Sequence, residues 1–155
     1  MLAALWWSAF TVAGIWGQNF VPGVDLLAAG LVVSLQEQTR SKTFWLAVAW
    51  IVLQEGIGSL AFGYGILWYG ALTAMFFLGR WLFEAKSILF IGLIGISLGV
   101  LHFAFTLTLA SLEDLALPQG RLLAESALQV LTFPACWWAA DRLYPARLKK
   151  DERPL

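Results

Sequence analysis

The chain has few of the residues that build catalytic or metal centres. Its 155 residues include one histidine, His102, and one cysteine, Cys136. One histidine excludes a haem held by two histidines of this chain, as well as a His-rich metal site. One cysteine excludes an intrachain disulfide, and the sequence offers no group that would activate its thiol. With no Ser-His-Asp set and no glycine-rich phosphate loop after a strand, we expect a non-enzymatic protein without a cofactor.

Charged residues are also scarce. They make up 13% of the chain against 60% hydrophobic residues, and the mean hydropathy is +0.75. This leaves too little polar surface to cover a soluble globule of this size, so we expect a polytopic membrane protein in contact with lipid and without a nucleic-acid partner. Residues 1–17 are apolar but lack a basic leading region, which favours a first membrane segment over a cleaved signal peptide.

The apolar segments predict an all-α bundle of six transmembrane helices in a single domain, residues 1–143, followed by a charged tail, residues 144–155. The second and third segments are short, and twelve helical residues span only about 18 Å of a core of roughly 30 Å. Asp25 opens the second segment as a helix cap or first-turn acid, and Pro134 is expected to kink or locally break the sixth. The segments are residues 1–17, 24–35, 43–57, 64–83, 88–112 and 121–143.

The basic residues predict the orientation. With six crossings, every Lys and Arg except Arg121 falls on the side of the N-terminus, and the positive-inside rule then places both termini in the cytoplasm. Treating residues 1–36 as one broken passage gives five crossings and moves only the N-terminus. Four tail bases are expected to mark the cytoplasmic surface and meet lipid headgroups: Arg142, Arg147, Lys149 and Lys150.

An acid, an amide and glycines interrupt the apolar pattern after the third segment, in the stretch Gln54-Glu55-Gly56-Ile57-Gly58. A carboxylate at mid-bilayer costs roughly 2.5 to 3.5 kcal/mol on insertion scales, so we expect Glu55 near the non-cytoplasmic surface. The glycines permit a tight turn between two short crossings.

Two helical faces carry small or polar residues within arcs of about 80°. We interpret both as intramolecular contacts, with His102 a buried, hydrogen-bonded histidine. The alternative is that one face, more readily that of the sixth segment, docks another membrane protein or lines a small cavity. The fifth segment presents Gly92, Gly95, Gly99, His102 and Thr106, and the sixth presents Arg121, Glu125, Gln129, Thr132 and Cys136.

The whole pattern resembles the rod-shape-determining MreD family of membrane proteins. The resemblance rests on Pro22 and Asp25 near the start of the second segment, on the glycine-rich break at residues 54–65, and on the closing helix with Pro134 and a basic tail. Two features depart from the family pattern: Gly23 and Val24 split its Pro-Asp pair, and Glu55 stands where Asp is usual.

The resemblance implies a six-helix inner-membrane protein, similar in fold to the substrate-binding subunits of energy-coupling-factor vitamin transporters. It also implies a non-enzymatic role beside MreC and the RodA and penicillin-binding-protein pair in peptidoglycan synthesis, under MreB. Glycines 92, 95 and 99 are expected to pack helices. Residues expected to contact a partner or line a cavity are Asp25, Gln54, Glu55, Gly56, Gly58, His102, Glu125 and Gln129.

Two other functions remain open from the sequence. The same architecture could serve as a solute-binding subunit of a vitamin-type transporter, or as an accessory anchor subunit of a membrane redox complex. Stabilisation by a vitamin-like compound would favour the first. Copurification with cytochrome or iron–sulfur subunits would favour the second.

Overall fold

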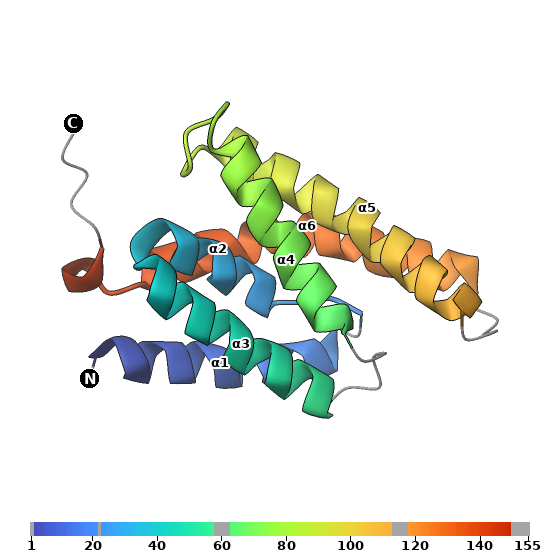
Figure 1. Ribbon diagram of the computed structural model, residues 1–155, viewed down its shortest axis with the longest axis horizontal. Coiled ribbons are helices and arrows are strands. Elements are labelled where there is room, and N and C mark those ends of the chain that lie inside the picture. The colour runs from blue at the N-terminus through green and yellow to red at the C-terminus, as the bar shows by residue number, and fades with distance from the viewer. Residues whose placement is uncertain (1, 22, 58–62, 113–117, 150–155) are drawn as a thin grey trace.

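The computed structural model describes residues 2–21, 23–57, 63–112 and 118–149. These residues form six α-helices and a short 3-10 helix, η1, with no strand among them (Figure 1). The all-helical fold class is therefore confirmed. The helices are α1 (Leu2–Phe20), α2 (Leu27–Glu37), α3 (Arg40–Ile57), α4 (Tyr64–Gly79), α5 (Ile88–Leu112) and α6 (Gln119–Leu143), followed by η1 (Ala146–Leu148).

Helix boundaries differ from the predicted ones where polar residues continue a helix. The predicted segments 24–35 and 43–57 leave residues 36–42 as a connecting loop, but α2 ends at Glu37 and α3 begins at Arg40. The corner is this tight because Thr43 donates a hydrogen bond to the Ser34 carbonyl (3.0 Å) and the two side-chain hydroxyls also lie 2.9 Å apart. α3 is consequently 18 residues long, not a short segment as predicted.

Pro134 does not break the last helix, contrary to one of the two outcomes predicted for it. α6 runs without interruption through Pro134 from Gln119 to Leu143. Pro134 has no N–H to donate to the Val130 carbonyl, and that carbonyl faces Gly95 of α5, where a Cβ would lie 3.2 Å from its oxygen. A glycine on the neighbouring helix therefore provides the space in which the proline is accommodated.

α2 is the central helix of the bundle. It packs against α1, α3, α4 and α6, and Leu27, Leu31, Val32 and Val33 are fully buried. Gly30 allows this close packing, since a Cβ there would collide with the Phe10 ring and lie 2.9 Å from the Trp50 ring. Although α2 has only 11 residues, longer helices surround it and it exposes no large apolar side chain.

The chain alternates in direction so that four segments meet at one end of the bundle (Figure 1). The N-terminus meets the end of α6 there, where Trp6 Nε1 donates to the Leu143 carbonyl at 3.0 Å. The α2–α3 corner meets the α4–α5 connection, where Gln36 donates to the Ala85 carbonyl (2.6 Å) and Lys86 pairs with Glu37 (2.9 Å). We call this the basic end.

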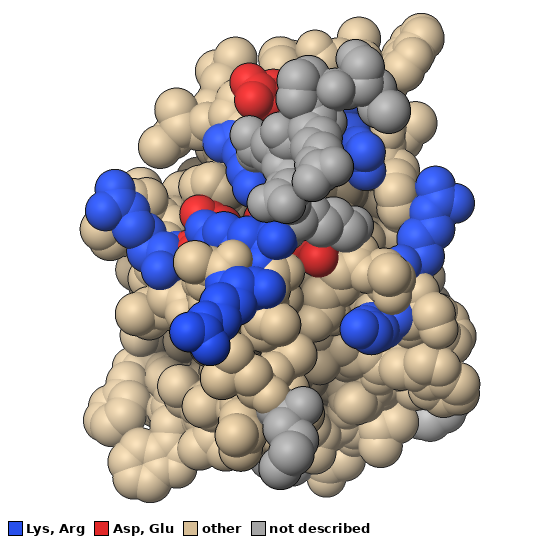
Figure 2. Space-filling model, turned by 90° about the vertical axis from the view of Figure 1, so that its left-hand side faces the viewer, with Lys and Arg blue, Asp and Glu red and all other residues tan. Residues whose placement is uncertain are grey.

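Most described basic residues lie at the basic end, and Figure 2 shows Lys and Arg side chains spread over that face. Arg121 lies in the first turn of α6, at the opposite end. The basic-end residues, placed by the helix ends that they belong to or follow, are Arg40, Lys42, Arg80, Lys86, Arg142, Arg147 and Lys149. The described basic residues that the predicted topology puts on one side therefore also lie at one end of the folded bundle.

α5 and α6 form the longest pair, with 25 residues each, and extend beyond the other helices at the end opposite the basic end (Figure 1). Within the described ranges, α5 is the one helix that is both long and apolar enough to cross a membrane on its own, with a mean hydropathy of 2.4.

Candidate functional site

A polar cluster around Asp25 lies where the α1–α2 connection enters the bundle. Asp25 is half-buried and lies two residues before the start of α2, and its Oδ1 accepts hydrogen bonds from the amides of Leu27 (2.9 Å) and Ala28 (3.3 Å). These first-turn amides have no partner within the helix, and the helix dipole favours an anion beside them. The predicted capping role of Asp25 is confirmed.

Three side chains from other helices bind the same carboxylate. Gln18 of α1 and Gln54 of α3 each donate from Nε2 to Oδ1 at 3.0 Å. Trp68 of α4 donates from its indole N–H to Oδ2 at 2.8 Å. Gln54 Nε2 also lies 2.7 Å from the Tyr69 hydroxyl, which brings a second α4 side chain into the cluster.

Gln129 adds α6 through the backbone of Asp25. Its Oε1 accepts from the Asp25 amide at 2.8 Å, and its Nε2 lies 3.4 Å from the Asp25 carbonyl. The Gln129 side chain is fully buried and uses both ends of its amide on one residue. One loop residue therefore joins α1, α2, α3, α4 and α6. The Asp25 cluster comprises Gln18, Asp25, Gln54, Trp68, Tyr69 and Gln129.

The chemistry of the Asp25 cluster suits structural organisation. Hydrogen bonds to a charged group each contribute about 1.5 to 3 kcal/mol, roughly twice a neutral one. All five donors to the carboxylate are neutral N–H groups, which orient the anion without neutralising it. With both oxygens occupied by protein donors, the arrangement fixes helix positions and does not present a free base to a substrate.

A second polar group lies beside the cluster, on α4, α5 and α6. Glu125 accepts from Arg121 Nε at 2.8 Å and lies 3.9 Å from His102 Nε2. His102 is buried, and its Nδ1 lies 3.4 Å from the Tyr64 hydroxyl. Gly23 packs on Glu125: its φ of +81° favours glycine, and a Cβ would lie 2.6 Å from the Glu125 carboxyl carbon.

His102 and the acids do not gather into a metal site in the part of the chain that the structure describes, since no group of three His, Cys, Asp or Glu side chains could hold an ion there. The arrangement Tyr64–His102–Glu125–Arg121 is instead a polar contact between helices.

Glu55 caps the fourth helix. Its Oε1 accepts from the amides of Gly63 (3.1 Å) and Gly65 (3.2 Å), at the start of α4. Gly63 has φ +92°, a left-handed conformation that favours glycine. Gly56 is exposed in α3 and a Cβ there would meet no neighbour, while Gly58 lies outside the described residues. Glu55, near the end of α3, thus holds the start of α4 through two backbone amides.

Removing this cap is expected to have a moderate effect. Glu55→Ala should lower the free energy of unfolding by about 1 kcal/mol, the typical value for loss of a capping side chain. Glu55→Gln should lose less, because an amide oxygen can still accept. Thermal unfolding of the purified protein in detergent measures both. Glu84→Ala, which removes an exposed acid, is the control, and an equal loss in that variant would contradict the capping role.

The remaining predicted residues lie on α5, α6 and the basic end. Gly95 and Gly99 face α6, whereas a Cβ on Gly92 would meet nothing within 4 Å. Arg142 lies over the Trp138 ring at 4.8 Å, and Lys149 pairs with Asp141 at 3.1 Å. Arg147 lies in η1, and Lys150 is outside the described residues.

The structure brings together Asp25, Gln54 and Gln129 and sets Glu125 and His102 beside them. Sequence reasoning missed Gln18, Trp68 and Tyr69. Gln18 was visible as an amide directly after the first apolar segment, whereas Trp68 and Tyr69 lie within an apolar segment in which the sequence marks no polar partner for them. Comparison of the chain with protein-family models, curated proteins and solved structures finds no match.

Proposed function

We propose that this chain is a non-enzymatic, multi-pass scaffold protein of the bacterial inner membrane, of the MreD type, that binds MreC and the elongation machinery of peptidoglycan synthesis. The observation that carries the proposal is that Asp25 and Glu55, two residues that carry the resemblance to the MreD family, hold the helices together. Asp25 joins five helices, and Glu55 closes the connection between α3 and α4. A scaffold needs a fixed shape, and these residues supply it.

Exposed apolar side chains support the membrane placement. Large apolar residues lie on the surface of α1, α3, α4, α5 and α6, and water would penalise so much exposed hydrocarbon, whereas lipid does not. Representative residues are Trp16, Trp45, Leu67, Val100 and Leu131, each at least half exposed. The lengths also fit, because 16 to 25 helical residues span about 24 to 37 Å and the hydrocarbon core is roughly 30 Å thick.

The short α2 is compatible with six crossings. It is enclosed by the other helices, so residues 23–26 and α2 together can complete the second crossing without placing polar backbone in lipid. The basic end then lies in the cytoplasm with both termini, by the positive-inside rule.

The partner surface that we favour is the part of the α5–α6 pair that extends beyond the other helices. Asp25, Gln54 and Gln129 are engaged with one another, and Glu55 is engaged with α4. Arg121 has a side chain that is 69% exposed beside the 18% exposed Glu125, so it can contact a non-cytoplasmic or membrane-embedded segment of MreC.

Copurification from native membranes tests the proposal. The tagged chain is expected to retain MreC, and Arg121→Glu is expected to reduce the recovered MreC several-fold by reversing the charge of the contact. Arg142→Glu makes the same change at the basic end and is expected to have little effect. Absence of MreC from the unmodified protein would contradict the function, and equal recovery from both variants would contradict the surface.

A further inference from the structure

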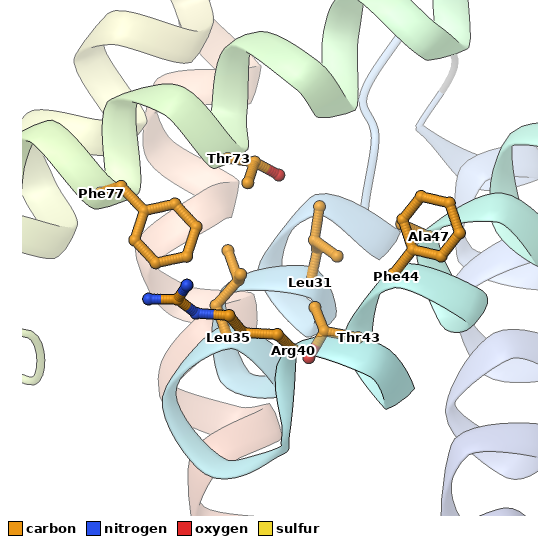
Figure 3. A pocket seen from close by; sticks show the side chains of 8 residues that line it. All are labelled: Leu31, Leu35, Arg40, Thr43, Phe44, Ala47, Thr73 and Phe77. Carbon is orange, nitrogen blue, oxygen red and sulfur yellow. The ribbon is translucent and has the colours of Figure 1, made fainter.

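α3 and α4 touch at one end and separate toward the other. Glu55 and Ile51 of α3 contact the start of α4 at Gly65, where a Cβ would lie 3.2 and 3.3 Å from their side chains. Toward the basic end the two helices are separated by a groove of about 400 Å³. Leu31 and Leu35 of α2 lie at its base (Figure 3).

The interior of this groove is apolar. Ala47 of α3 and the methyl-bearing Thr73 of α4 form its walls beside the two leucines. Thr43 also lines it, but its hydroxyl already donates to the Ser34 carbonyl at 3.0 Å. Few polar groups remain to orient a polar solute, so the lining favours hydrocarbon.

A single cation lies at the edge of the groove. Arg40, the first residue of α3, is exposed at the basic end, and its guanidinium carbon lies 5.6 Å from the centroid of the Phe77 ring (Figure 3). Phe44 and Phe77 are exposed at the groove by 60% and 41%. A guanidinium held over an aromatic face keeps its N–H donors for an anion, and its planar fork matches phosphate geometry.

We propose that this groove binds one acyl chain of an anionic phospholipid from the cytoplasmic leaflet, with the lipid phosphate on Arg40. The inference rests on the proposed membrane placement, which puts the basic end at the cytoplasmic surface. The charge is complementary, because the described residues that line the groove include one cation and no acid. A partner helix fits poorly, since a helix about 10 Å wide fills roughly 400 Å³ in a single 5.4 Å turn.

Lipid retained through purification tests the proposal. The protein is inserted into vesicles of phosphatidylcholine and phosphatidylglycerol, extracted in mild detergent and examined by native mass spectrometry. The unmodified protein is expected to retain one phosphatidylglycerol per chain in preference to phosphatidylcholine. Arg40→Gln is expected to reduce this retention about tenfold, the effect of losing one charge-assisted contact.

Three further variants distinguish binding in the groove from general electrostatic attraction to the basic end. Lys42→Gln removes a neighbouring exposed charge outside the groove and should leave retention unchanged. Ala47→Trp should fill the groove and abolish retention of either lipid, and Thr73→Leu provides a second, smaller filling; helix content by circular dichroism checks that each variant folds.

Three results would overturn the proposal: equal losses in Arg40→Gln and Lys42→Gln, unchanged retention in both filled variants, or a retained solute that is not a lipid. Failure of the chain to insert into vesicles would instead count against the proposed membrane placement.

Discussion

Replacing Asp25 with leucine is expected to lower the free energy of unfolding by about 3 to 5 kcal/mol, because several neutral N–H donors lose their common acceptor at once. The side chains of Gln18, Gln54 and Trp68 would lose their acceptor, as would the first amides of α2. Each donor left unsatisfied inside the bundle costs about 1 to 3 kcal/mol, although some will find other partners.

The measurement is thermal or denaturant unfolding of the purified protein in detergent. Asp25→Asn should fall between leucine and the native residue, because one oxygen can still accept from the α2 amides while the new NH₂ group faces another donor. Asp141→Asn is the matched control: it weakens a partly exposed pair with Lys149, and such pairs contribute about 0 to 1 kcal/mol. Equal losses in Asp25→Leu and Asp141→Asn would contradict the organising role of the Asp25 cluster.

Two glycines of α5 are expected to respond to alanine with opposite signs. A Cβ on Gly99 would collide with Val130 and lie 2.9 Å from the Ser126 carbonyl oxygen, which is backbone and cannot move aside. Gly99→Ala should therefore lower stability by about 1 to 3 kcal/mol, as overpacking does. Gly92→Ala meets no neighbour and should raise stability by up to about 1 kcal/mol through helix propensity.

The same unfolding assay measures both glycine variants, and each is the other's control. Destabilisation by Gly92→Ala equal to that by Gly99→Ala would show that α5 and α6 do not pack as described.

The sequence predicted local features better than the placement of helices. The capping of α2 by Asp25 followed from an acid at the start of an apolar run, because capping depends on neighbouring residues only. The shared face of Gly92, Gly95 and Gly99 was visible from helical periodicity. Only Gly95 and Gly99 contact α6, because the angle at which α5 and α6 cross decides where they touch. Helical periodicity does not give that angle.

The central position of α2 was harder to predict. Its 11 residues are few for a membrane crossing, and nothing in its sequence shows that four other helices pack around it. Trp68 was equally hidden, because an indole reads as apolar until a carboxylate lies beside its N–H. Glu55 was expected near the membrane surface as a contact for a partner. Its carboxylate instead accepts from the Gly63 and Gly65 amides, a contact that depends on how α4 is placed beside α3.

Side-specific cysteine labelling tests the central claim, a membrane-spanning bundle with its basic end in the cytoplasm. In a Cys136→Ser background, single cysteines replace Ala4, Ser41 and Lys149 at the basic end and Gln119 at the other end. A membrane-impermeant maleimide added to intact spheroplasts should label the cysteine at position 119 alone, and the other three should react only after the membrane is opened. Labelling of positions 41 and 119 from the same side would contradict the account.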